Sequence, residues 1–348
     1  MFNHQAYLIK TLTNTHMGAF DSTDNLIDNM IQSENYSFMP SRKKKVQLPV
    51  IHASSLKGAI KDHFALFKSN KNKQPKGSDY VKPLTFDLLF GQKDLFTRLS
   101  DNIDTSAAIQ KELELDPIKT LRKFRPKQGL LKFYKAHLLT IPMPCTTNIF
   151  YHATSPGIAI NFLNTLNQFL QKNDKINQLI QQFKLWQTIL NDQSKDFIVF
   201  TSNAPIISGN GNGLSIEPDE LCHTMASRFS PNGSDCFLNS LAIFKDDVLL
   251  DMYDINRSVI PRNKLSDQGV SKNLFYEEVL PKHAVLWFIC GQYNLPADTT
   301  TLNDYSSDAH YIEKAFRFFE NRLQSDTIQM GANASLGYGM TSISKMII

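Results

Sequence analysis

Short apolar runs alternate with amphipathic helical stripes along this chain, and that alternation limits the folds open to it. The runs FIVF at 197–200 and VLWFIC at 285–290 have the length and composition of buried strands. Because strands are separated by helices and lie far apart in sequence, the pattern predicts an α+β fold with helices covering one face of a sheet. Two helical stripes carry this prediction: Phe162, Leu166, Phe169 and Leu170, then Ile176, Leu179, Ile180 and Phe183.

The first 145 residues follow the same pattern. Residues 6–12 and 130–140 are expected to form strands. The polar stretch 13–45 is expected to be a long loop, and loops of that length in compact domains are usually functional or disordered. Pro142 and Pro144 should end regular strand pairing, because proline has no amide hydrogen to donate.

The charge of the chain does not by itself indicate a partner. The formal net charge is +4 and the pI is near 8.7, values that many proteins without nucleic-acid partners share. Lysine and arginine cluster in the first half, at 42–45, 68–76 and 119–127, where they would neutralise an RNA backbone. Solvated lysine-rich loops explain each cluster equally well, so both interpretations stay open.

Cysteine spacing and hydropathy exclude some classes of protein. Cys145, Cys222, Cys236 and Cys290 lie far apart without a C-x-x-C pair, which argues against a structural zinc site or a disulfide framework. The N-terminal residues lack a signal-peptide core, and no apolar run approaches the ~20 residues that span a bilayer. We therefore expect a cytoplasmic protein without a membrane partner.

The segment 48–61 is the first candidate binding element. A strand end leads into a small polar turn and a helix that starts at Ser54 or Ser55, either of which would be its N-cap. The free amides of such a helix start favour a phosphate, and Lys57 adds a positive charge. A capped helix start followed by a surface lysine is also routine in proteins that bind nothing there.

A glycine loop near the C-terminus is the second candidate. Residues 331–339 (GANASLGYG) are flanked by strand-like sequence at 328–330 and 340–347, after a helical stripe at 312–323. The glycines allow close backbone approach, so the amides could converge on RNA phosphates while Tyr338 stacks or packs. A flexible hairpin connection is the alternative. The loop does not match the phosphate-loop pattern, because Tyr338 follows Gly337.

The third candidate is the polar loop near the N-terminus, with His16, Asp21, Asp24 and Asp28. Loop carboxylates are usually solvated. Beside a basic RNA groove, however, a carboxylate could bind Mg²⁺ and orient a nucleophile for phosphodiester cleavage. His16 could act as a general acid or base, although its spacing supplies no catalytic partner and favours a structural or RNA-contacting role.

Taken in order, these segments resemble the RAMP superfamily of CRISPR proteins, and specifically the repeated backbone subunit of type III-B, Cmr-like effectors. The serine–lysine helix start together with a C-terminal glycine loop is shared by several RAMP subunits. The Asp28 segment and the FYEE segment narrow the resemblance to the backbone subunit. The similar patches run from end to end of the chain: 7–18, 28–38, 48–64, 88–91, 273–281 and 331–339.

The resemblance implies one RAMP domain over 1–348, built on a ferredoxin-like, RRM-type palm with a thumb hairpin and helical insertions. The thumb is expected at 255–281. The polar insertion at 65–128 and the helical elaboration at 159–196 are larger than a minimal family member needs.

The resemblance also implies a function. Copies would stack into a filament on CRISPR guide RNA, with other effector subunits, in an antiviral ribonucleoprotein. The chain would be an endoribonuclease active within the complex, cutting single-stranded target RNA with Mg²⁺ or another divalent metal. Asp28 would be both catalytic residue and metal ligand. The residues implied to contact RNA are His16, Ser54, Ser55, Lys57, Lys272, Tyr276, Gly331, Asn333, Gly337 and Tyr338.

Two other functions remain open on the sequence. The chain could be a non-catalytic guide-RNA scaffold that uses the same surfaces. It could also be a RAMP nuclease that processes guide precursors, centred on His16 and independent of metal. All three interpretations require the helix start near Ser55 and the glycine loop to meet in space.

Overall fold

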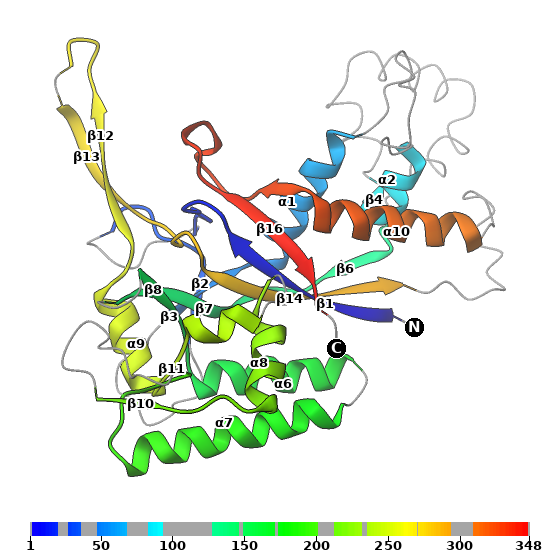
Figure 1. Ribbon diagram of the computed structural model, residues 1–348. Helices are drawn as coiled ribbons and strands as arrows, with labels where there is room; N and C mark the ends of the chain where they lie inside the picture. The colour runs from blue at the N-terminus through cyan, green and yellow to red at the C-terminus, as the bar shows by residue number, and fades with distance from the viewer. Residues whose placement is uncertain are drawn as a thin grey trace, which may run out of the picture. The chain divides into compact units, whose positions relative to one another are not determined.

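Figure 1 draws the computed structural model. Its contacts divide the chain into two compact units. Unit 1 consists of Met1–Asn3, Lys61–Lys132 and Gly291–Arg322, and unit 2 of His4–Ile60, Phe133–Cys290 and Leu323–Ile348. Most of the expected insertion at 65–128 lies outside the described residues, and so do the basic clusters at 42–45 and 68–76 and all of the cluster at 119–127 except its last residue. The structure describes residues 2–19, 27–35, 47–67, 83–92, 127–145, 149–170, 173–200, 212–231, 235–269, 271–293 and 309–346.

A large mixed sheet forms the framework of unit 2. Its strands follow the order β10-β9-β11-β8-β7-β14-β1-β16-β15, with β2 and β3 paired beside β7. The expected α+β architecture is therefore correct. The strands of this sheet are β1 Phe2–Thr11, β2 Ser33–Asn35, β3 Gln47–Ile51, β7 Ala136–Pro144, β8 Phe150–Thr154, β9 Phe197–Val199, β10 Gly213–Ser215, β11 Leu241–Phe244, β14 Val285–Tyr293, β15 Thr327–Gln329 and β16 Met340–Lys345. The short strand β6 (Leu131–Phe133) also belongs to this sheet and pairs with β14.

Pairing between the two ends of the chain fixes the place of the candidate loops. Strand β1 runs antiparallel to β16, with Tyr7 opposite Lys345 and Thr11 opposite Thr341. Tyr7 is fully buried and stacks on Phe288 of β14, with ring centroids 5.2 Å apart. This pairing brings the residues that follow β1 next to the residues that precede β16, although they are far apart in sequence.

Strand β7 continues past Pro142 and ends at Pro144, so the expectation that these prolines end regular pairing was wrong for the edge that faces β8. Pro142 pairs with His152 of β8, and Pro144 pairs with Phe150. The pairing of β7 with β14 on its other edge reaches only as far as Thr140. Beyond Thr140 one edge of β7 carries no described pairing with β14, and this is the kind of edge position where proline is tolerated.

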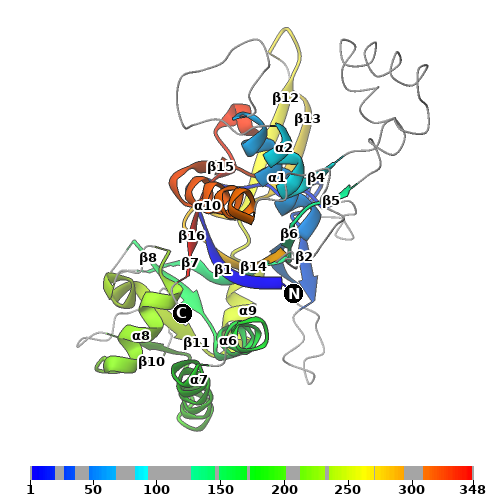
Figure 2. The same cartoon turned by 90° about the vertical axis from the view of Figure 1, so that its right-hand side faces the viewer.

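Two of the long helices pack together in unit 2. Helix α6 (Pro156–Phe169) begins after the N-cap Ser155, and α7 (Asp174–Asp192) begins after the N-cap Asn173. Both predicted stripes are buried for the most part, as shown by Phe162, Leu166 and Phe183. Figures 1 and 2 show α6 between the sheet and α7. The unit also contains α8 Glu220–Phe229, the 3₁₀ helix η1 Asp235–Ser240, and α9 Asp246–Ile255.

A two-stranded hairpin extends from unit 2 away from the sheet (Figure 1). Strand β12 (Val259–Leu265) runs antiparallel to β13 (Ser271–Glu278), within the range expected for a thumb. Side chains toward its tip are exposed, including Leu274 at 55%. Only the base is buried, where Glu277 and Glu278 lie.

Unit 1 has its own aromatic cluster. The elements of unit 1 are α2 (Pro83–Phe90), the short strands β4 (Gly91–Gln92) and β5 (Lys127–Gln128), the end of α1 (Ala53–Ala65) and most of α10 (Ala309–Ser325). Phe64 of α1 lies against Phe90 and Phe319, with ring centroids 5.6 and 5.4 Å away. The helical stripe predicted at 312–323 thus packs through Phe319 against Phe64 of α1.

Candidate nucleic-acid interface

The glycine loop is attached at both ends to the segment that follows β1. The amide of Ala332 donates to the carbonyl of His16 at 2.9 Å, and the amide of Gly339 donates to the carbonyl of Asn14 at 2.8 Å. A short 3₁₀ helix, η3 (Ala334–Leu336), lies between these anchors and is exposed. The middle of the loop therefore faces solvent while its ends are held by backbone hydrogen bonds.

Left-handed backbone explains why glycine occupies the ends of this loop. Gly331 and Gly339 have φ of 82° and 80°. A Cβ on Gly331 would lie 2.2 Å from the carbonyl oxygen of His16, and one on Gly339 would lie 2.1 Å from that of Met330. Asn333 also adopts φ of 63°, a conformation that asparagine tolerates better than most residues. Gly337, at φ of 76°, has open space around it.

Gln32 attaches the start of α1 to the same segment. Its side-chain oxygen accepts from the amide of His52 at 2.8 Å. Its side-chain nitrogen donates to the Ser55 hydroxyl at 2.9 Å and to the Gly18 carbonyl at 3.2 Å. With Gln32 only 9% exposed, the three hydrogen bonds hold the helix start beside Gly18. The helix start and the glycine loop therefore meet on residues 14–18.

The expected N-cap at Ser54 or Ser55 was wrong. Helix α1 begins at Ala53, and the amide of Leu56 already donates to the carbonyl of His52 at 2.9 Å. Both serines therefore lie in the first turn of the helix. Ser54 is exposed, and the Ser55 hydroxyl is engaged with Gln32. Lys57 follows on α1 and is half-buried.

His16 is a buried residue next to the glycine loop, and its ring forms a hydrogen bond with the backbone. It is 6% exposed, and its Nδ1 donates to the backbone carbonyl of Glu278 at 2.7 Å. Nε2 lies toward Gly18, where an added Cβ would be 3.2 Å away. The Nδ1 atom is 3.8 Å from the Glu277 carboxylate. These contacts give His16 a structural position at the junction of the loop and the hairpin.

Glu277 joins the hairpin to the glycine loop. Its Oε2 lies 2.6 Å from Nε of Arg262 on β12, and its Oε1 accepts from the Asn333 side chain at 2.8 Å. The Arg262 guanidinium lies over the ring of Tyr338, 5.0 Å from the centroid, a cation–π arrangement. The Glu277 side chain is only 6% exposed, so this ion pair is largely shielded from water.

Asp28 lies at the base of the hairpin. Its Oδ2 accepts from the amide of Tyr276 at 2.7 Å, and the amide of Asn29 donates to the Tyr276 carbonyl at 3.1 Å. The amide of Ile31 donates to the Glu278 carboxylate at 3.2 Å. Asp28 itself is exposed, and none of the described residues donates to its second oxygen.

Glu278 supports this loop from below. Besides Ile31, it accepts from the Tyr253 hydroxyl of α9 at 3.4 Å. Burial raises the pKa of the Glu278 carboxyl, against the opposing effects of the Ile31 amide and Arg257. Burial also raises the pKa of Tyr253, which keeps that hydroxyl protonated as a donor.

The predicted residues are thus not all in one place. His16, Ser55, Gly331, Asn333 and Tyr338 are joined through the contacts described above. Tyr276 is 41% exposed and anchors Asp28 through its backbone. Lys272 is exposed on the outer part of β13, and no described contact joins it to this group.

Four residues of the interface were missed on the sequence. Gln32, Asn14, Arg262 and Glu277 connect segments that are far apart along the chain. The pair Glu277-Glu278 at the end of β13 was the one signal for such a connection. Buried acidic residues require partners, so this pair could have indicated a contact with a basic or amide side chain.

A family model described as the RAMP superfamily matches residues 8–341. The chain belongs to the RAMP superfamily. No curated protein matched it. The match covers nearly the whole chain, including the helix start and the glycine loop, so both candidate binding elements lie within the family region.

Solved structures share the fold of this RAMP protein. A type III-B Cmr-beta structure in the apo state has a TM-score of 0.60 and 14% identity, covering 98% of this chain and 96% of the other. Oligomeric Cmr4 from Pyrococcus furiosus has a TM-score of 0.57 and 16% identity, covering 99% and 98%. Cmr-beta bound to cognate target RNA has a TM-score of 0.55 and 14% identity, covering 98% and 96%. The RAMP fold expected from the sequence is confirmed.

The described residues of the RAMP protein form no cluster of metal ligands. Within the part of the chain that the structure describes, no group of three or more His, Cys, Asp or Glu side chains is placed to hold one. Asp21 and Asp24 lie outside that part. The exposed Asp28 carboxylate fits Mg²⁺ as a single protein ligand, because this ion often takes one or two carboxylates together with substrate phosphates and water.

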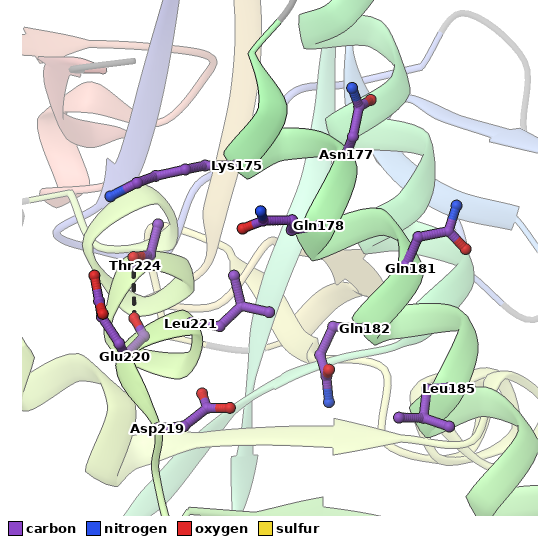
Figure 3. A pocket seen from close by; sticks show the side chains of 10 residues that line it. All are labelled: Lys175, Asn177, Gln178, Gln181, Gln182, Leu185, Asp219, Glu220, Leu221 and Thr224. Atoms are coloured by element: carbon purple, nitrogen blue, oxygen red, sulfur yellow. Dashed lines mark hydrogen bonds between the residues drawn. The ribbon is translucent and has the colours of Figure 1, made fainter.

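A separate groove of about 850 Å³ lies between α7 and α8 (Figure 3). Its walls are mainly amide and acidic side chains with Leu185 and Leu221, and the Thr224 hydroxyl donates to the Glu220 carbonyl at 3.0 Å. None of the interface residues lines it.

No described helix of the RAMP protein is both long and apolar enough to cross a membrane.

Proposed function

We propose that this RAMP protein is a backbone subunit of a type III-B CRISPR effector complex, which binds guide RNA and cleaves complementary target RNA beside Asp28. The observation that carries the proposal is the meeting of the helix start and the glycine loop on residues 14–18, with Asp28 at the base of the adjoining hairpin.

The relatives support the partners in this proposal. The similar Cmr4 structure is described as oligomeric, and one of the Cmr-beta structures is bound to cognate target RNA. Each likeness covers more than nine tenths of both chains. We infer that copies of this chain stack along a guide RNA, together with other effector subunits.

The chemistry of the interface suits an RNA backbone. In the exposed middle of the loop, no described hydrogen bond uses the amides of Asn333, Ala334 or Ser335, and successive amides at a left-handed turn can bind an anion. Lys57 on the first turns of α1 adds positive charge near the free amides of that helix. Arg262 lies on the ring of Tyr338, and such a pair offers a flat surface on which a base can stack. Sequence readout is not required, because guide and target would pair with each other.

Asp28 is the proposed cleavage residue. Its anchored oxygen fixes the side chain, and the other oxygen faces solvent, where a target phosphate or its attacking hydroxyl would lie. A divalent metal held by Asp28 would supply charge stabilisation at the scissile phosphate. The buried His16, with Nδ1 engaged by a backbone carbonyl, supports a structural role and speaks against the precursor-processing alternative.

The test is cleavage of a labelled complementary RNA by the purified complex. Wild type should cut with Mg²⁺ and stop with a chelator. Asp28→Ala should assemble with guide RNA but not cut, while Asp192→Ala, on the exposed end of α7, should cut like wild type. Short guides that co-purify with a complex that never cuts would establish the non-catalytic scaffold. A chain free of RNA would refute the backbone role.

A further inference from the structure

Beyond the glycine loop, a second cluster in unit 2 combines positive charge with stacked rings. We propose that Lys10, Phe150, Lys282 and His283, here called the His283 platform, bind single-stranded RNA by stacking a base on His283 and pairing both lysines with phosphates. The identification of RNA as the partner rests on the proposed function. The platform itself includes none of the residues assigned to the interface above.

The aromatic part of the platform is already assembled. The rings of Phe150 and His283 are stacked, with centroids 4.9 Å apart and planes 20° from parallel. Both side chains are half-buried, so neither is closed off from solvent. Next to Phe150, Ile149 is 91% exposed and extends the apolar surface. Bases of single-stranded RNA commonly stack on phenylalanine and histidine in such settings.

The backbone holds His283 in an unusual conformation. Its φ is 74°, a left-handed value that is uncommon for residues other than glycine. The amide of His283 donates to the carbonyl of Thr11 at 2.8 Å, and the Thr11 hydroxyl donates to the carbonyl of Pro281 at 2.7 Å. These bonds attach the turn before β14 to the end of β1, so the ring is preorganised against Phe150. A glycine would adopt the same turn without strain, which makes it a clean test variant.

Positive charge gathers around the His283 ring. Burial lowers the pKa of His283, and the nearby charges of Lys10 and Lys282 lower it further. Burial lowers the pKa of His152, and the charges of Lys10 and His283 lower it further. The His152 ring lies edge-on to Phe150, with centroids 5.1 Å apart. Among the described residues, no acidic side chain contributes to either shift. A phosphate chain would supply the missing negative charge.

Hydrogen bonds of Asn14 connect the His283 platform to the end of the glycine loop. The amide of Lys282 donates to the side-chain oxygen of Asn14 at 3.1 Å. The carbonyl of Asn14 in turn accepts from Gly339. One residue therefore separates the turn that carries His283 from the end of the loop, and an RNA strand that follows the loop can run directly onto the platform.

The experiment measures the affinity of the full chain for an unstructured, labelled single-stranded RNA and for inorganic polyphosphate, over a range of salt concentrations. His283→Gly and Phe150→Leu should weaken RNA binding by about fivefold or more, the lower end of one lost base stack, and leave polyphosphate binding unchanged. Lys282→Gln should weaken both and reduce the slope of log affinity against log salt by about 0.7. The matched control Lys184→Gln, exposed on α7, should change neither.

The outcomes separate this proposal from the proposed function. If His283→Gly and Phe150→Leu bind RNA as tightly as wild type while Lys57→Gln binds more weakly, the platform is wrong and the backbone role stands. If wild type binds no RNA and none co-purifies with it, both fall. Glycine relieves the left-handed strain but loses the stack on Phe150 and adds freedom to the unfolded chain, so the melting temperature of His283→Gly is measured beside its affinity. Weaker RNA binding well below the melting temperature of the variant then reflects the lost ring and not unfolding.

Discussion

The Asp28 carboxylate accepts a hydrogen bond from the backbone amide of Tyr276, with 2.7 Å between oxygen and nitrogen. The two residues are 248 positions apart, and the bond joins the polar loop near the N-terminus to the base of the β12–β13 hairpin. Because the same hairpin base supplies Glu277 to Asn333, the position of Asp28 and the shape of the glycine loop depend on one element.

The Asp28→Asn variant removes the negative charge of the side chain and keeps an oxygen that can accept the hydrogen bond from Tyr276. The amide oxygen of asparagine can still accept from Tyr276, so the free energy of unfolding should change by no more than about 0.5 kcal/mol. Loss of the negative charge should slow target cleavage by about 10²-fold or more, measured in single-turnover reactions of the purified complex. If Asp28→Asn preserves the wild-type rate while Asp28→Ala abolishes cleavage, the residue acts only as an anchor.

Glu277→Gln should destabilise the chain. Glutamine can keep the hydrogen bond to Asn333 but leaves Arg262 without its carboxylate in a shielded site, at a cost of about 1–3 kcal/mol in chemical unfolding. The control is Glu313→Gln in the exposed pair with Arg317, where less than about 0.5 kcal/mol is expected. Equal effects of the two changes would show that the Glu277 pair contributes no more than a surface ion pair.

The glycines of the loop should differ sharply in their tolerance of alanine. Gly337→Ala meets no neighbouring atom and should cost about 1–2 kcal/mol for its left-handed backbone. Gly331→Ala has the same backbone cost and also drives a methyl group into the carbonyl of His16. Thermal unfolding should show a clearly larger loss for Gly331→Ala, together with weaker RNA binding. Similar melting temperatures for the two variants would contradict the close approach at His16.

The buried His152 should make stability fall with acid. Burial, with help from Lys10 and His283, lowers the pKa of His152 from 6.5 to about 3 in the folded chain. The unfolded chain therefore takes up the proton first, so the stabilisation is complete above the unfolded pKa and is lost as the pH falls toward the folded one.

The measurement is chemical unfolding between about pH 6 and pH 4, where this one group contributes a slope of up to about 1.4 kcal/mol per pH unit. His152→Gln, which can keep the contact with Thr140, should remove that slope while other titrating groups cancel in the comparison. Parallel pH profiles for wild type and variant would show that His152 is not buried in its neutral form.

Local periodicity determined much of the fold. The stripes at Phe162 and Phe183 predicted α6 and α7 because an amphipathic helix repeats its buried face every 3.6 residues, whatever it packs against. The strands on either side of the glycine loop followed in the same way from short apolar runs. The order of the motifs was enough to indicate the RAMP superfamily, which the family match established.

The tertiary structure alone decided how the candidate site is assembled. Gln32 joins Ser55 to Gly18, and Glu277 joins Arg262 to Asn333, through hydrogen bonds and ion pairs between residues that no local pattern relates. It also decided that Ser54 and Ser55 lie inside α1 and that strand β7 keeps its pairing with β8 up to Pro144. Those outcomes depend on which neighbouring groups form hydrogen bonds with each backbone amide and carbonyl. Strand pairings such as β1 with β16 determine these neighbours, and such pairings form only when the whole chain folds.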